Sequence, residues 1–134
     1  MAPAQIKSRS LPDQLLHENA TWKRVLGFLT EENINLKNRL SEILQNKADC
    51  DKSFLEQVEY FQNSFLKQDE VLGFLRIEVG DQEKSLLPAN FPGTAEQLKE
   101  IQKKQKKLRQ EFESAELLFN KLKFEFNSYL STIL

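Results

Sequence analysis

The side chains most easily tuned for acid–base or nucleophilic chemistry are one histidine, His17, and one cysteine, Cys50. A neutral imidazole can act as a general base near neutral pH, and a thiolate can act as a nucleophile. If two helices fold back on each other at residues 46–51, helical rise separates these groups by about 45 Å. They cannot then act on one substrate, and we expect no catalytic residues.

Metal and cofactor sites in helical bundles need histidine, methionine or clustered carboxylates at inward positions. The chain holds one histidine and one methionine, and the acidic pairs Glu31-Glu32 and Asp69-Glu70 fall outside the apolar repeat. No phosphate-binding glycine loop and no nucleophile elbow is present. We therefore expect a protein that is not an enzyme, with no cofactor and no metal site.

A basic stretch occupies residues 99–109, where helical spacing aligns Lys99, Lys103 and Lys106 on one stripe. Such a stripe could contact a nucleic-acid backbone or another anionic surface. The alternative is that it faces the acidic second helical segment, which would present Asp69, Glu70 and Glu78 at comparable height. Opposite charges beside an apolar seam commonly select helix partners, so we favour the pairing and disfavour a nucleic-acid partner.

The elements that position these residues are three long segments with apolar side chains at alternating spacings of three and four residues. This spacing gives a helix one apolar face. Only four glycines and four prolines are present, which also favours helices over the turns of a sheet. We expect helices at about 13–46, 50–80 and 94–133, after a flexible segment over residues 1–12.

Turn residues mark where the helices should end. Gly80 is suited to terminate the second helix, and Thr94 with Gln97 forms a capping box that opens the third. The connection at 46–51 is polar without glycine or proline, and we prefer a tight hairpin there over one continuous helix.

The predicted fold is all-α, an antiparallel three-helix bundle with coiled-coil-like heptad packing and a long C-terminal helix. Residues 13–134 are expected to form one bundle. The layout resembles spectrin-type three-helix repeats in helix count and heptad use, which implies a fold and assigns no function.

Polar residues interrupt the apolar seams. The hairpin sets Asn33 level with Phe65, and a third helix that starts level with the end of the second brings Gln105 near Gln68. We expect Asn33, Gln68 and Gln105 to form one polar core level, which would fix helix register. A loop of this length would also permit a shift of one heptad.

Surplus apolar side chains lie on the third helix. Leu117 and Phe124 are seven residues apart and roughly opposite its seam. In the same register the last turns overhang the hairpin, which extends the expected interface to four further residues: Phe126, Tyr129, Leu130 and Ile133. The alternative is that the loop, with Leu86, Leu87 and Phe91, or the region of Ile6 and Leu11 folds over some of the surplus apolar surface. We expect a protein-interaction module that binds itself or another helical protein, most simply as a homodimer.

A five-residue sequence, Val-Leu-Gly-Phe-Leu, occurs at 25–29 and again at 71–75. Glycine within a helix costs stability but permits close backbone approach. The repeat therefore indicates either a close helix crossing or pocket, or a chance echo in an apolar sequence, which we favour.

Charge and composition restrict location and ligands. Nineteen basic and twenty acidic residues nearly cancel, and no apolar stretch of membrane-spanning length occurs. The single cysteine fits a reducing cytoplasm. One further function stays open, which is binding of a small apolar ligand in a core lined by Trp22, Phe61, Phe65 and Phe112.

Overall fold

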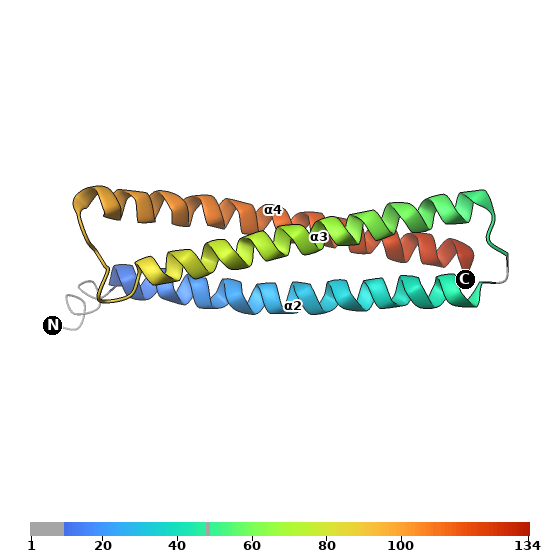
Figure 1. Cartoon of the computed structure of the whole chain (residues 1–134), viewed down its shortest axis with the longest axis horizontal. Coiled ribbons are helices and arrows are strands. Elements are labelled where there is room, and N and C mark those ends of the chain that lie inside the picture. Colours follow the sequence, from blue (N-terminus) through green and yellow to red (C-terminus); the bar gives the residue numbers. More distant parts are fainter. Residues whose placement is uncertain (1–9, 48) are drawn as a thin grey trace. The chain divides into compact units, whose positions relative to one another are not determined.

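The computed structural model describes residues 10–47 and 49–134, which form three α-helices packed against each other (Figure 1). These are α2 (Ser10–Asn46), α3 (Lys52–Ser85) and α4 (Ala95–Ile133). No strand occurs in this part of the chain. The all-α fold with three packed helices is confirmed. The flexible segment predicted for residues 1–12 falls largely outside the described residues.

The chain divides into two compact units. Unit 1 comprises Met1–Leu26 and Phe74–Glu113, and unit 2 comprises Gly27–Gly73 and Ser114–Leu134. Each unit takes a segment from all three helices, so each has its own core and surface. The expectation of one bundle over 13–134 stays a prediction.

The predicted hairpin between α2 and α3 is confirmed in unit 2. The Asn33 amide donates a hydrogen bond of 3.0 Å to the carbonyl of Phe65, the residue predicted at its level. Asp51 caps α3 by accepting a 2.8 Å hydrogen bond from the Phe54 backbone N–H. One continuous helix through this region is therefore wrong.

The second connection begins later than predicted. Helix α3 continues past Gly80 to Ser85, and both Gln82 and Leu86 are buried. The next helix opens with the predicted capping box, because the Thr94 and Gln97 side chains each accept a hydrogen bond from the other's backbone N–H. The burial of Gln82 explains why α3 extends: its seam continues for another turn beyond the glycine.

The core of unit 1 combines aromatic stacking with loop residues. Trp22 on α2 stacks on Phe112 of α4, with ring centroids 4.9 Å apart. At another level, Leu15 and Ile101 pack with Leu86 from the connection, and the half-buried Phe91 packs against them. The loop therefore covers seam residues of α2 and α4 in unit 1, whereas the surplus side chains Leu117 and Phe124 are exposed.

The core of unit 2 is rich in phenylalanine. Phe126 on α4 packs edge-on against Phe61 and Phe65 of α3, at centroid distances of 5.1 and 5.2 Å. Tyr129 lies 5.7 Å from Phe61. The end of α4 is thus held beside the first turns of α3.

The register of α4 against α3 differs from the prediction by two heptads. In unit 1 Gln105 contacts Gln82, which lies 14 residues after the predicted partner Gln68. In unit 2 the Tyr60 hydroxyl donates a 2.9 Å hydrogen bond to Glu125, which fits the shifted register. The last turns of α4 therefore lie beside α3, and the predicted overhang is wrong.

The repeated Val-Leu-Gly-Phe-Leu sequence does not mark a close helix crossing. A methyl group built at Gly27 or Gly73 would meet nothing within 4 Å. Both glycines lie inside helices with open space beside them, which contradicts the close-crossing alternative.

Candidate functional site

The most exposed large apolar side chains on the interior turns of α4 are Leu117 and Phe124 in unit 2. They are 72% and 73% exposed, on the opposite side of the helix from the buried Ala115 and Phe119. In unit 2 the neighbours on this side bear one charge, on Lys121, and Glu113 of unit 1, four residues before Leu117 in sequence, is a second charged residue near this side. We call this surface the Leu117–Phe124 face and define it by six residues: Ser114, Leu117, Asn120, Lys121, Phe124 and Ser128.

Four further interface residues were predicted, and the structure places them elsewhere. Phe126 and Leu130 are buried in unit 2, and Tyr129 and Ile133 are half-buried. The predicted register left these turns uncovered, whereas the observed register lays them against α3. Phe126 and Leu130 are therefore core residues and cannot form an exposed patch.

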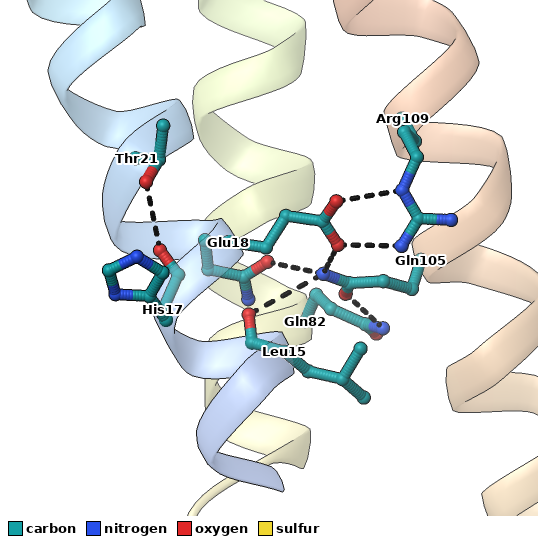
Figure 2. Close-up of polar contacts among 8 residues, drawn as sticks. Leu15, His17, Glu18, Thr21, Gln82, Gln105 and Arg109 are labelled. Carbon is teal, nitrogen blue, oxygen red and sulfur yellow. Dashed lines mark hydrogen bonds and ion pairs between the residues drawn. The ribbon is translucent and has the colours of Figure 1, made fainter. Parts of the chain in front are cut away.

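The predicted polar level separates into two arrangements. In unit 1 the Gln105 side-chain amide donates hydrogen bonds of 2.8 Å to Glu18 and 3.0 Å to the Asn19 carbonyl oxygen (Figure 2). Its own carbonyl oxygen accepts a 3.0 Å hydrogen bond from Gln82. We call Asn19, Gln82 and Gln105 the Gln105 layer. All three helices contribute to it, and all three side chains are buried.

A partly exposed ion pair between Glu18 and Arg109 lies next to the Gln105 layer. The Arg109 guanidinium donates two hydrogen bonds of 2.7 Å to the Glu18 carboxylate (Figure 2). The hydrogen bond from Arg109 lowers the pKa of Glu18, while partial burial opposes this effect. The same bond raises the pKa of Arg109. This two-bond ion pair links α2 to α4, and both charged groups are used in it.

In unit 2 Asn33 and Gln68 are buried, but they do not join Gln105. The Asn33 amide donates to the Phe65 carbonyl and, at 2.8 Å, to Asp69, whose other oxygen accepts from Lys37 at 2.6 Å. Gln68 makes no hydrogen bond within residues 10–47 and 49–134. The predicted single level of Asn33, Gln68 and Gln105 is therefore wrong, although each of the three is buried.

Sequence reasoning missed the roles of Asn19 and Gln82. A signal for Gln82 was present, because it follows Val79 by three residues and precedes Leu86 by four. The glycine at position 80 hid this continuation of the seam. Asn19 lies in the first seam, 14 residues or two heptads before Asn33. Gln105 of α4 could therefore meet a seam asparagine of α2 in either of two registers.

The basic stripe does not face α3 as expected. Lys99, Lys103 and Lys106 are exposed, and none of them forms an ion pair with the described residues. Its neighbour Lys104 pairs with Glu78 at 3.0 Å. Of the acidic residues expected as partners, Glu78 thus pairs with the basic stretch through Lys104, whereas Asp69 pairs with Lys37 of α2.

The residues first considered for chemistry lie on the surface. His17 is exposed in unit 1, where its backbone carbonyl accepts a 3.1 Å hydrogen bond from Thr21 (Figure 2). Cys50 is an exposed free thiol in unit 2. Among the described residues, no group of three or more histidine, cysteine or acidic side chains could hold a metal ion.

The aromatic residues proposed to line one ligand pocket are divided between the units. Trp22 and Phe112 stack in unit 1, whereas Phe61 and Phe65 pack in unit 2. Each pair fills its own core and is buried there. The four side chains therefore do not line a common pocket within either unit.

Hydropathy and comparison with known proteins add two findings. No described helix combines the length and the apolar character that crossing a bilayer requires. No family model matches the chain, and neither a curated protein nor a solved structure matches it.

Proposed function

We propose that this protein is a non-enzymatic interaction and assembly module that forms a homodimer through the Leu117–Phe124 face, in the cytoplasm. The exposure of Leu117 and Phe124 carries the proposal. Contiguous exposed apolar side chains mark protein interfaces more often than chance. The single cysteine supports a reducing compartment.

The composition of the face suits burial in a dimer. Burying a leucine or phenylalanine side chain contributes about 1.5–3 kcal/mol. Serine and asparagine around these two residues are cheaper to desolvate than charged groups, and the centres of interfaces are depleted in charge. The Leu117–Phe124 face therefore has an apolar centre with few charges to neutralise.

Two-fold symmetry gives the face a self-complementary pairing. If two α4 helices meet antiparallel about an axis beside Asn120 and Lys121, Leu117 of each copy lies opposite Phe124 of the other. Such an isologous contact buries all four apolar side chains and closes the assembly at two copies. It also brings the two Lys121 side chains near each other, which costs stability through like-charge repulsion.

Light scattering across a concentration series tests the dimer. We expect the wild type to be a dimer and the double variant Leu117→Glu, Phe124→Glu to be a folded monomer. The matched control is Leu55→Glu with Leu66→Glu, two exposed leucines of α3 in the same unit, which should remain dimeric. A wild-type monomer throughout the series, or a dimeric double variant, would refute the proposal.

The charge near the axis offers a second test of the same geometry. Replacing Lys121 with glutamine should tighten the dimer, and added salt should tighten the wild type more than this variant. A dimer weakened by Lys121→Gln would reject the antiparallel pairing.

The unpaired basic stripe supports a second candidate function, which is binding of nucleic acid or another anionic surface. Lys99, Lys103 and Lys106 point away from intramolecular acidic partners, so their charge is available. The test is a salt-dependent shift assay with labelled duplex DNA, using Lys103→Glu with Lys106→Glu. Affinity should fall steeply with salt and in the variant, and unchanged binding would reject this candidate.

A further inference from the structure

A groove between α3 and α4 in unit 2 borders the Leu117–Phe124 face and shares Lys121 with it. It has a volume of about 290 Å³, and we call it the α3–α4 groove. Six of its lining residues matter for what it could bind: Tyr60, Lys67, Gln68, Val71, Leu118 and Lys121.

The floor of the groove holds a polar group without a partner. Gln68 is only 7% exposed, and within the described residues its side chain makes no hydrogen bond. The neighbouring Asn33 directs its amide to Phe65 and Asp69 instead. The buried side-chain atoms without a partner among the described residues are Asn19 Nδ2 and Asn33 Oδ1, so the unpaired Gln68 amide is open to the groove and can hydrogen-bond to a molecule there. A bound molecule that reaches Gln68 would satisfy it.

The charged residues of the groove favour an acidic ligand. Lys67 and Lys121 line it from α3 and α4, and neither forms an ion pair with the described residues. The acidic lining residue, Glu125, already accepts a hydrogen bond from the Tyr60 hydroxyl. The lining thus carries two cations, neither of them paired with Glu125, against one carboxylate, and this excess of positive charge favours an acidic ligand.

The apolar surface has the length of a short helix. Tyr60, Val71 and Leu118 are 50%, 36% and 60% exposed beside the groove. Tyr60 and Val71 are eleven residues apart on α3, a span of about 16 Å or three turns at helical rise. An amphipathic helix binds such a surface through apolar side chains spaced three, four and seven residues apart.

We propose that the α3–α4 groove binds an acidic amphipathic helix of a partner protein, which packs in unit 2 as a fourth helix. Its apolar side chains cover Val71 and Leu118, and its carboxylates pair with Lys67 and Lys121. A carboxylate or carboxamide of the same helix hydrogen-bonds to Gln68. This interaction goes beyond self-association and uses neither Leu117 nor Phe124.

Fluorescence anisotropy with two synthetic helices tests the proposal on the full chain. The probe is a labelled 18-residue amphipathic peptide, of about five turns, with leucines on one face and flanking glutamates. The control peptide carries lysine at every glutamate position. The glutamate peptide should bind at least about tenfold more tightly, as expected for two charge-assisted pairs. No binding of either peptide, or equal binding of both, would overturn the proposal.

Variants connect binding to the groove. Lys67→Glu with Lys121→Glu should reverse the preference between the two peptides, and Gln68→Leu should weaken the glutamate peptide several-fold while the protein stays folded. Lys52→Glu is the matched control, since Lys52 is an exposed lysine of α3 outside the groove. An unchanged preference after the double charge reversal would overturn the proposal. The Leu117→Ala, Phe124→Ala variant removes apolar surface from the face without adding charge beside Lys121, so it should bind the glutamate peptide as wild type does, which separates the two interactions.

Discussion

Gln82 of α3 donates a 3.0 Å hydrogen bond to Gln105 of α4 inside unit 1. The same Gln82 amide donates to the Ile101 carbonyl at 2.7 Å, and the Gln105 amide reaches Asn19 of α2. One buried glutamine thus connects all three helices. These hydrogen bonds hold α4 at the observed register in unit 1, although the Asn19 side-chain nitrogen is buried without a partner among the described residues.

Replacing Gln105 with leucine should destabilise the protein by about 1–3 kcal/mol, because Asn19 and Gln82 would each lose a buried hydrogen-bond partner. Chemical denaturation followed by circular dichroism measures the change. Gln102→Leu, at an exposed position three residues away, is the control and should change stability by less than about 0.5 kcal/mol. Equal effects at the two positions would contradict the role of the layer.

Stability should depend on the ionisation of Glu18. Its folded pKa is lowered from the ordinary value of 4.5, so its stabilising effect is full above that value and is lost as pH falls through the folded pKa. The pair is partly exposed, so we expect a contribution of no more than about 1 kcal/mol. Denaturation at pH 6 and pH 3 should show a smaller acid loss for Glu18→Gln than for wild type. An identical acid loss in both proteins would show that Glu18 does not contribute.

Truncating two phenylalanines of α4 should change the free energy of unfolding by very different amounts. Phe126 is fully buried and packs against Phe61 and Phe65 of α3, whereas Phe124 is 73% exposed. Phe126→Ala should cost about 3–5 kcal/mol by leaving a cavity. For Phe124→Ala the free energy of unfolding of the monomer should change by less than about 0.5 kcal/mol. Thermal melts at a concentration where the protein is monomeric distinguish the two, and similar losses would contradict the register of α4.

The effect of a glycine-to-alanine substitution on stability should depend on the backbone conformation of the glycine. Gly27→Ala and Gly73→Ala should each stabilise the protein by about 0.5–1 kcal/mol, because both positions are helical with open space beside them. Gly93 has a φ of +69°, and a methyl group there would collide with the Gln97 side chain of the capping box. Gly93→Ala should therefore destabilise by more than about 1 kcal/mol. Denaturant midpoints test all three, and destabilisation at Gly27 or Gly73 would indicate an unrecognised contact.

The seams of the three helices could be predicted because burial follows a fixed period. Leu26, Leu40, Phe65 and Leu108 are buried as the spacing of three and four residues requires. The capping box was equally legible, since Thr94 and Gln97 satisfy each other through local geometry alone. The end of α3 could not be predicted from sequence. Gly80 is a typical helix-terminating residue, but the packing of Gln82 and Leu86 in the core extends the helix to Ser85.

The register of α4 could not be derived from the seam. Asn19 and Asn33 are 14 residues apart, as are Gln68 and Gln82, so Gln105 meets a similar pair of amides in either of two registers. The connection before α4 is long enough to permit both. The register is set by contacts between side chains far apart in sequence, such as Phe126 with Phe61 and Phe65, and the spacing within one helix does not predict such contacts. The exposure of Leu117 and Phe124 was predictable because it depends on helix face and not on register.

The single tryptophan of the chain stacks on Phe112 in unit 1, and unit 2 contains none. Its emission spectrum is therefore a native optical reporter of one unit, without any introduced dye. Circular dichroism, by contrast, sums the helical signal of the whole chain. If the two signals change at the same denaturant concentration, the units melt as one cooperative transition; if they diverge, each unit has its own midpoint.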